Sequence, residues 1–546
     1  MRGRALVAAV GSVALLVTVP GGAFATQPCR AELACGPDLD EALRLEERVA
    51  DHLWYGSVLP IDYRTAEKVP GDVASIDPQW GDAGIWSGSY LGAESYRYAV
   101  ARSHQAGDAR SGFWQQQQRQ AKQRVDVLLS QVDLRTFVAR AWQEPVQPSV
   151  APGVPPTAEV GGVVPGQAGM LMYSCAPADA PGPYAMPRGS DVRGPFRWEG
   201  NDRPERLTQP AGDYVCEAST TRDAYAGTLF GLLAAFDLVA PDDLEVQRLI
   251  RDDVLAMADF LLANGWNYPH PHGEVALPPF GDVYDNVVTP IMVISPAYRL
   301  LVSLAAKHVA EVAGPPEQAL KWQAVWAEEL ASQSPSDVVA ELVNDPTPNG
   351  GYFSWNLAHL VFSPLLRLTT AEERALLRES FSIVDRQTSD DVNAFFEAVT
   401  FGMGGEPARR EAAVTHLRQW RDYRARQDAG GAVDHVAECG TSRDCVPADQ
   451  FDLVWDTPAG EQRTTVPGSS SDLRSVEPIS VADRVPTDFL WQRSPFTAMR
   501  GGSAATHQEP GVDYLLPYWM LRYLTEVAPP AQEPLPTWPG PRYSGS

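Results

Sequence analysis

The sequence predicts an all-α protein, an (α/α)6 toroid in which six helical hairpins form an inner and an outer ring. Three observations favour this fold class. Twelve stretches with helical periodicity follow one another along the chain. The connections between them alternate between long and short. The stretches also alternate between apolar ones and ones with a polar face.

The expected helices are 38–54, 84–104, 111–142, 220–239, 242–264, 285–313, 316–332, 351–368, 370–386, 389–402, 406–426 and 511–524. The connections after the second, fourth, sixth, eighth and tenth helices are tight. The long connections are 55–83, 143–219, 265–284, 333–350 and 427–510. Because consecutive helices alternate in direction, we expect the long loops on one face. Loops of more than ~15 residues are often functional, so we expect the function there as well.

The helices differ in character according to their place in each hairpin. Stretches 85–93, 225–236 and 287–294 carry apolar and small residues nearly all round, which is typical of buried helices. Stretches 115–124 and 409–426 have a strongly polar face. The apolar helices are therefore expected to form the inner ring and the others the outer ring.

The N-terminal residues have the pattern of a secretory signal. Arg2 and Arg4 precede an apolar run at 6–19, and an Ala-x-Ala cleavage site follows at 23–25. The apolar run is shorter than the ~20 residues that a spanning helix needs. We expect a secreted, extracellular protein without a membrane span, and an uncleaved N-terminal anchor is the alternative.

The helical pattern continues without an obvious linker after this signal. We therefore expect residues 1–25 to be a signal peptide and residues 26–528 to form one domain. Within it, 143–219 and 427–510 would be long insertions. A proline-rich tail is expected at 529–546.

The charge of the chain is strongly acidic, with 44 Lys and Arg against 69 Asp and Glu and a net charge of −25. This balance argues against nucleic acid, since phosphate binding relies on clustered cations. It argues equally against anionic lipid surfaces and favours solubility. We expect a monomer that needs no cofactor.

Six cysteines in an exported chain suggest disulfides. The simplest pairing joins Cys29 to Cys35, Cys175 to Cys216 and Cys439 to Cys445, although six cysteines allow fifteen pairings. The sequence contains no C-x-x-C and no H-x-x-x-H, so no metal site is expected.

Acidic residues open or precede the apolar helices, and three of them are candidate catalytic groups: Asp82, Asp223 and Asp285. Glycoside hydrolysis needs two carboxyl groups that flank the bond, one of them held protonated. We expect Asp223 or Asp285 to be the general acid and Asp82 to be the base or to position water. The alternative is that each caps its helix, because helix N-termini favour carboxylates. Further polar residues at such starts are Glu217, Asn286, Asn349, Asp390, Asp391 and Asp513.

Aromatic and polar residues near these starts are candidates for contact with a sugar. Indole rings stack on the C–H faces of sugars, but they also pack large cores. Arg222 and Arg493 could bind a carboxylate or neutralise the aspartates, and His270 could be the base of a lyase. The candidate substrate-binding residues are Trp80, Trp86, Arg222, His270, Trp355, Asn356, Trp491, Arg493 and Tyr514.

In hairpin count and texture the chain resembles the six-hairpin glycosidase-like toroids, which include unsaturated glucuronyl hydrolases and polysaccharide lyases. Segments 82–91, 221–227 and 512–519 look like those of secreted bacterial proteins of this architecture. The resemblance implies a carbohydrate-active enzyme on a poly- or oligosaccharide, with hydrolysis favoured over a lyase reaction. A non-catalytic glycan-binding or scaffold protein is the alternative, because the fold alone does not give the function.

Overall fold

The computed structural model describes most of the chain between Leu33 and Ser544. The described residues are 33, 36–76, 82–105, 110–141, 168–180, 192–217, 220–266, 296–343, 352–447, 452–457, 460–465, 473–485, 494–502, 504–536 and 541–544. Among the expected features, the signal peptide and the pair Cys29–Cys35 lie outside these residues.

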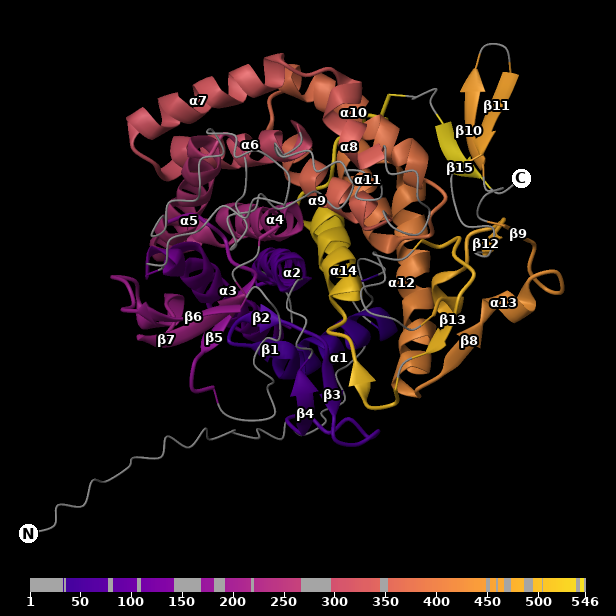
Figure 1. The fold of residues 1–546 in the computed structure, drawn as a ribbon, viewed down its shortest axis with the longest axis horizontal. Coiled ribbons are helices and arrows are strands. Elements are labelled where there is room, and N and C mark those ends of the chain that lie inside the picture. Colours follow the sequence, from indigo (N-terminus) through magenta and orange to yellow (C-terminus); the bar gives the residue numbers. More distant parts are fainter. Residues whose placement is uncertain are drawn as a thin grey trace, which may run out of the picture.

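The described part of the chain is mostly helical (Figure 1). Its helices are α1 (Pro37–His52), α2 (Ala83–Ser103), α3 (Ser111–Phe137), α4 (Arg222–Leu238), α5 (Leu244–Ala263), α6 (Pro296–Ala313), α7 (Pro316–Ala331), α8 (Pro335–Val343), α9 (Tyr352–Leu368), α10 (Ala371–Thr388), α11 (Ala394–Gly404), α12 (Pro407–Asp428), α13 (His435–Glu438) and α14 (Val512–Glu526). Twelve of them match the expected helices, whereas α8 and α13 were not predicted. The expected start of α6, residues 285–295, lies outside the described residues.

The prediction of an all-α protein is confirmed only in part, because the mostly helical chain also contains small antiparallel sheets in its long connections. The strands are β1 (Leu53–Trp54), β2 (Ser57–Val58), β3 (Ile61–Tyr63), β4 (Val73–Ile76), β5 (Ser174–Pro177), β6 (Val192–Trp198), β7 (Gly212–Glu217), β8 (Ala432–Asp434), β9 (Cys445–Pro447), β10 (Asp452–Thr457), β11 (Gly460–Thr465), β12 (Leu473–Ser475), β13 (Arg500–Gly502), β14 (His507–Gln508) and β15 (Pro541–Ser544). Most of these strands have only two to four residues, which is too few to show a clear period of two in the sequence.

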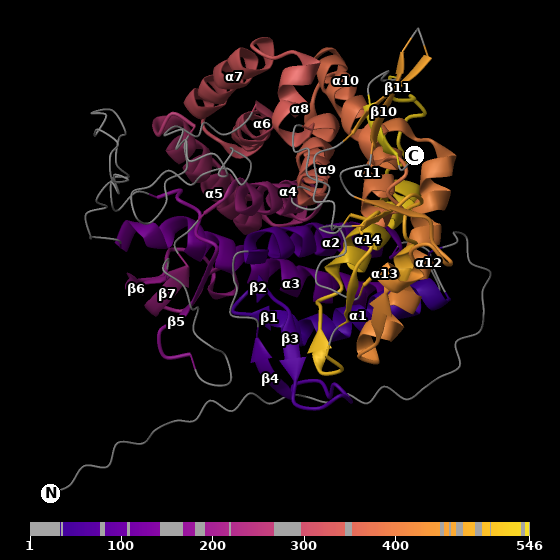
Figure 2. The same cartoon turned by 45° about the vertical axis from the view of Figure 1, so that its right-hand side comes forward.

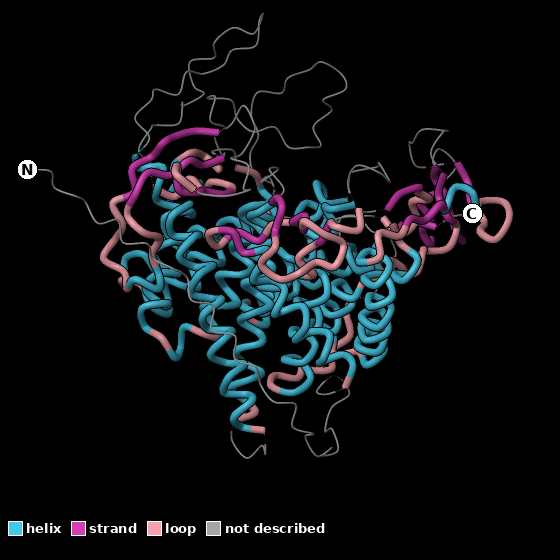
Figure 3. Tube along the Cα trace, turned by 90° about the horizontal axis from the view of Figure 1, so that it is seen from below, coloured by secondary structure: helices cyan, strands magenta, loops and turns pink. Residues whose placement is uncertain are grey.

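These strands gather at one end of the helices (Figure 3). The three-stranded sheets have the orders β14-β3-β4, β5-β7-β6 and β11-β10-β15. The last of them includes part of the expected tail, since β15 pairs antiparallel with β10. The strand-bearing connections therefore cover one face of the helical layer.

The apolar helices pack on one another from one hairpin to the next (Figures 1 and 2). α2 contacts α3, α4 and α14, and α4 contacts α6 and α9. α9 contacts α11, which in turn contacts α14. Nearly every residue of α2 and α4 is buried, in agreement with their apolar sequences.

Glycines allow α2 and α4 to approach backbone to backbone. A Cβ atom added to Gly88 would lie 2.0 Å from the carbonyl oxygen of Gly227, and one added to Gly231 would lie 2.4 Å from that of Gly88. A Cβ atom on Gly84 would lie 3.0 Å from the Cα atom of Ala224. We call Gly84, Gly88, Gly227 and Gly231 the glycine contact. Any side chain at these positions would force the two helices apart.

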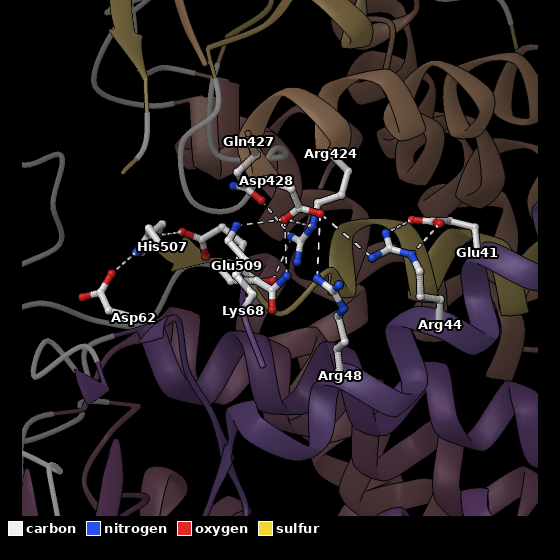
Figure 4. A network of polar contacts seen from close by, with 11 residues as sticks. Glu41, Arg44, Arg48, Asp62, Lys68, Arg424, Gln427, Asp428, His507 and Glu509 are labelled. Carbon is white, nitrogen blue, oxygen red and sulfur yellow. Dashed lines mark hydrogen bonds and ion pairs between the residues drawn. The ribbon is translucent and has the colours of Figure 1, made fainter. Parts of the chain in front are cut away.

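A different contact, made of charged side chains, joins α1 and the β3–β4 loop to α12 (Figure 4). Lys68 Nζ and Arg424 Nε lie 2.9 and 3.4 Å from Asp428 Oδ1. Arg48 Nη1 and Arg44 Nη1, both on α1, lie 3.8 and 4.0 Å from Asp428 Oδ2. We call these five residues the ionic contact. Four cations thus share one carboxylate.

Two of the expected disulfides are present. Cys175 pairs with Cys216 with a Cα–Cα distance of 4.1 Å, and Cys439 pairs with Cys445 at 5.3 Å. The first of these bonds joins β5 to β7, in which the two cysteines are register partners. Among the described residues, no helix is both long enough and apolar enough to cross a membrane.

Candidate functional site

Asp82 and Asp223 stand at the starts of α2 and α4, at the ends of these helices that face the strand-bearing connections. Asp82 is the residue before α2, and its side chain makes no capping hydrogen bond. In α4 the capping role belongs to Thr221, whose Oγ1 accepts from Ala224 N at 3.4 Å. Neither aspartate therefore acts as the side-chain cap of its helix.

The glycine contact brings these two helix starts together. Gly84 lies two residues after Asp82, and Ala224 follows Asp223 directly. A Cβ atom on Gly84 would touch Ala224, so the backbones that carry the two aspartates meet at this point.

The charges of both aspartates act on the hydroxyl group of Tyr173. Burial raises the pKa of the Tyr173 hydroxyl well above its usual value, and the charges of Asp223, Glu217 and Asp82 raise it further. The Thr221 side chain hydrogen-bonds to the same hydroxyl. Three carboxyl groups therefore raise the pKa of one phenol, which stays protonated at neutral pH.

The disulfide-linked sheet holds Tyr173 and Glu217 in place. Tyr173 precedes β5 and Glu217 ends β7, and Tyr173 N donates to Glu217 O at 3.1 Å. The bond between Cys175 and Cys216 ties these strands two residues and one residue away, respectively. The sequence indicates Glu217 only as a residue near a helix start, and Tyr173 is not among the expected site residues. The sequence feature that could have indicated Tyr173 is its place two residues before Cys175, a cysteine of the expected disulfide.

The carboxyl group of Asp223 lies in a largely buried environment. Burial raises the pKa of Asp223, although its neighbour Arg222 opposes this. Arg222 Nε lies 3.5 Å from Asp223 Oδ1, and 21% of the Asp223 side chain is exposed. The Arg222 guanidinium is itself buried and lies 5.8 Å from the ring centre of Tyr298. Arg222 thus contacts the aspartate, one of the two roles expected for it.

The other candidate site residues in the described part of the chain are not seen in contact with Asp82 or Asp223. Trp86 lies one turn further along α2 and is buried. Tyr514 is fully buried on α14 and donates its hydroxyl to Asp38 O at 3.0 Å. Trp355 and Asn356 are buried on α9, and neither amide atom of Asn356 has a hydrogen-bond partner. The candidates outside the described residues are Trp80, His270, Asp285, Trp491 and Arg493.

A second perturbed carboxyl group lies before α11. Burial raises the pKa of Asp391 to about 8, with Tyr352 and Arg484 as neighbours that oppose the shift. Asp391 is 4% exposed. Asp391 was expected at a helix start but is not among the candidate site residues that the sequence predicts.

No three or more His, Cys, Asp or Glu side chains of the described residues are grouped so that they could hold a metal ion. Comparisons of the chain with models of protein families, with curated proteins and with solved structures give no match.

Proposed function

We propose that the chain is a secreted carbohydrate-active enzyme, a glycoside hydrolase that acts as a monomer on a poly- or oligosaccharide. The observation that carries the proposal is the close approach of the α2 and α4 backbones at Gly84 and Ala224, next to Asp82 and Asp223. Neither carboxylate serves as a helix cap, and burial raises the pKa of Asp223. A pair of carboxyl groups in different environments suits acid and base roles.

The fold that we propose for this enzyme is the (α/α)6 toroid. The contacts from α2 through α4, α9, α11 and α14 back to α2 support it, as do the strands at one end of the helices. In such a toroid the starts of the inner helices surround one cavity, so Asp82 and Asp223 would lie on its rim.

The proposed reaction uses the two aspartates in turn. The proton of Asp223 passes to the glycosidic oxygen as its bond to the anomeric carbon breaks. Asp82 takes a proton from the water that attacks this carbon. The reaction ends with two shorter sugars, an ionised Asp223 and a protonated Asp82. Tyr173 keeps its proton and positions the carboxyl groups.

The test is a screen of the purified protein against polysaccharides, read for new reducing ends. On a substrate so found, Asp223→Asn should keep the unfolding temperature and lose about 10²–10⁴ of the rate, the typical contribution of general acid–base catalysis. The matched control is Asp243→Asn, because Asp243 caps α5 at the other end of the helices. Asn caps about as well as Asp, so this variant should keep its activity.

Three results would contradict the hydrolase. An Asp223→Asn protein with full activity would remove the site assignment. Products that absorb as unsaturated uronates would indicate a lyase instead. Binding of a glycan without any released reducing end would indicate a glycan-binding protein of the same fold.

A further inference from the structure

Arg484 is a buried cation whose charge no carboxylate neutralises directly. It is 4% exposed, and it follows a short 3-10 turn at Val481–Asp483. Its Nη2 donates to Asp391 O at 2.7 Å and to Val392 O at 2.9 Å, and its Nε donates to Ile479 O at 3.2 Å. Its Nη1 has no hydrogen-bond partner. In the described part of the chain Arg484 forms no ion pair.

The pKa values of His416 and Asp391 are affected by the charge of Arg484. Burial lowers the pKa of His416 to about 4, and the charge of Arg484 lowers it further. Asp391 is the carboxyl group whose charge acts on Arg484, and burial raises its own pKa to about 8. A raised pKa favours the uncharged form of this carboxyl group. A buried charge is costly unless it is paired and hydrogen-bonded.

The backbone beside Arg484 is strained. Val392 has a φ of 49°, a conformation that is rare for a β-branched residue. The two carbonyl groups that Arg484 Nη2 binds, those of Asp391 and Val392, lie on either side of this torsion. Strain of this kind persists where surrounding contacts enforce it, and it clusters at functional sites.

Further donors meet at the same place, between the N-terminal ends of α9 and α11. Asn393 is 2% exposed; its Oδ1 accepts from Phe395 N and Phe396 N, whereas its Nδ2 has no partner. Tyr352 lies against Asp391 and Asn393. Asn356 follows one turn later on the same face of α9, and its amide is without a partner.

We propose that Arg484 Nη1, Asn393 Nδ2 and the Tyr352 hydroxyl bind the carboxylate of a small acidic ligand between the starts of α9 and α11. These groups are donors, and a carboxylate offers acceptors in a plane that suits a guanidinium. The N-terminal ends of helices favour negative charge as well. The ligand would provide the anion that Arg484 lacks. The site includes neither Asp82 nor Asp223, so this proposal can be tested independently of the proposed hydrolysis.

The experiment is a titration of the whole protein with acetate, with glucuronate and with glucose, followed by calorimetry and by the unfolding temperature. Glucuronate should bind and raise the unfolding temperature, and glucose, its match without the carboxylate, should do neither. Acetate that binds as well as glucuronate would show that the carboxylate alone is recognised. Glucuronate that binds more tightly than acetate would indicate a sugar acid.

Two variants test the assignment of the residues. Asn393→Asp keeps the oxygen that caps α11 but places a negative charge beside Arg484, so it should abolish carboxylate binding while the unfolding temperature without ligand is kept or raised. Tyr352→Phe should weaken binding about tenfold, because it removes one donor to a charged acceptor. Tyr214→Phe is its control, since the Tyr214 hydroxyl donates to Pro210 O elsewhere in the fold.

Several results would overturn the proposal. Equal binding of glucose and glucuronate would show that no carboxylate is recognised. Unchanged glucuronate affinity in a folded Asn393→Asp protein would place the site elsewhere. The absence of binding by both acetate and glucuronate at millimolar concentration would remove it altogether.

Discussion

The glycine contact and the ionic contact hold neighbouring helices together in opposite ways. In the first, α2 and α4 meet backbone to backbone through residues that are all buried. In the second, charged side chains bridge α1 and α12, and Asp428 keeps 26% of its side chain exposed. The glycine contact is therefore a steric constraint that solution conditions do not relax. The ionic contact depends on charge, so pH and salt should weaken it.

The largest effect is expected from Gly88→Ala. The added methyl group would lie 2.0 Å from Gly227 O, an atom of the backbone that cannot move without separating α2 from α4. The free energy of unfolding, measured with urea, should fall by about 3 kcal/mol or more.

Gly112→Ala is the control for this substitution. A Cβ atom at Gly112, in the first turn of α3, meets nothing within 4 Å. The change should leave stability unaltered or raise it by up to about 1 kcal/mol, since Ala favours a helix more than Gly does. Equal effects of the two substitutions would show that the glycine contact is not as close as described.

A smaller loss is expected from Asp428→Asn, which removes the carboxylate of the ionic contact. Lys68 and Arg424 are almost fully buried and would lose their shared anion. Breaking a buried pair costs about 3–5 kcal/mol, and we expect about 2 kcal/mol here because Asp428 is partly exposed. The free energies of unfolding of this variant and of the unmodified protein, measured with urea, should differ less in 1 M NaCl.

Arg44→Met provides the matched comparison within the same contact. Arg44 is 36% exposed and lies 4.0 Å from Asp428, and exposed ion pairs of this kind contribute about 0–1 kcal/mol. A loss as large as that of Asp428→Asn would mean that burial of the partners does not decide the strength of the contact.

The smallest effect concerns His507, which extends the network of Figure 4 from Glu509 to Asp62. Although burial lowers the pKa of His507, the bonds to Glu509 and Asp62 raise it above 6.5. A raised histidine pKa stabilises the fold fully below pH 6.5, and this stabilisation is lost as the pH rises through the pKa of the folded state. The loss of stability caused by His507→Gln should therefore be about 0.5–1 kcal/mol greater at pH 6 than at pH 9. An equal loss at both pH values would contradict a charged His507.

The helices could be predicted from the sequence because their apolar pattern is local and long. The expected helix 84–104 is observed as Ala83–Ser103, and 220–239 as Arg222–Leu238. A buried ion pair of the same local kind joins Glu94 and Arg97, three residues apart on α2, with 3.1 Å between Arg97 Nη1 and Glu94 Oε2. Several strands were missed because they pair with a partner that is distant in sequence, as β3 pairs with β14.

The candidate site was predicted less completely than the helices, because some of its residues come together only through partners that are distant in sequence. Asp82 and Asp223 could be selected, since each precedes or opens an apolar helix. Tyr173 reaches them only through the β5–β7 sheet. Arg484 could not be selected at all, because it stands alone in a loop and its partners are backbone carbonyl groups.

The Cys175–Cys216 bond has a consequence for the unfolded chain. The two cysteines are 41 residues apart in sequence, so the bond closes a loop of this length even after the fold is lost. In the chain-entropy account, closing such a loop restricts the unfolded ensemble by about 4 kcal/mol. Thiols in a bacterial cytoplasm are kept reduced. In protein made there, the unfolded chain would lack this restriction. Ordering Tyr173 and β5 would then cost more conformational entropy than in protein exported to an oxidising compartment.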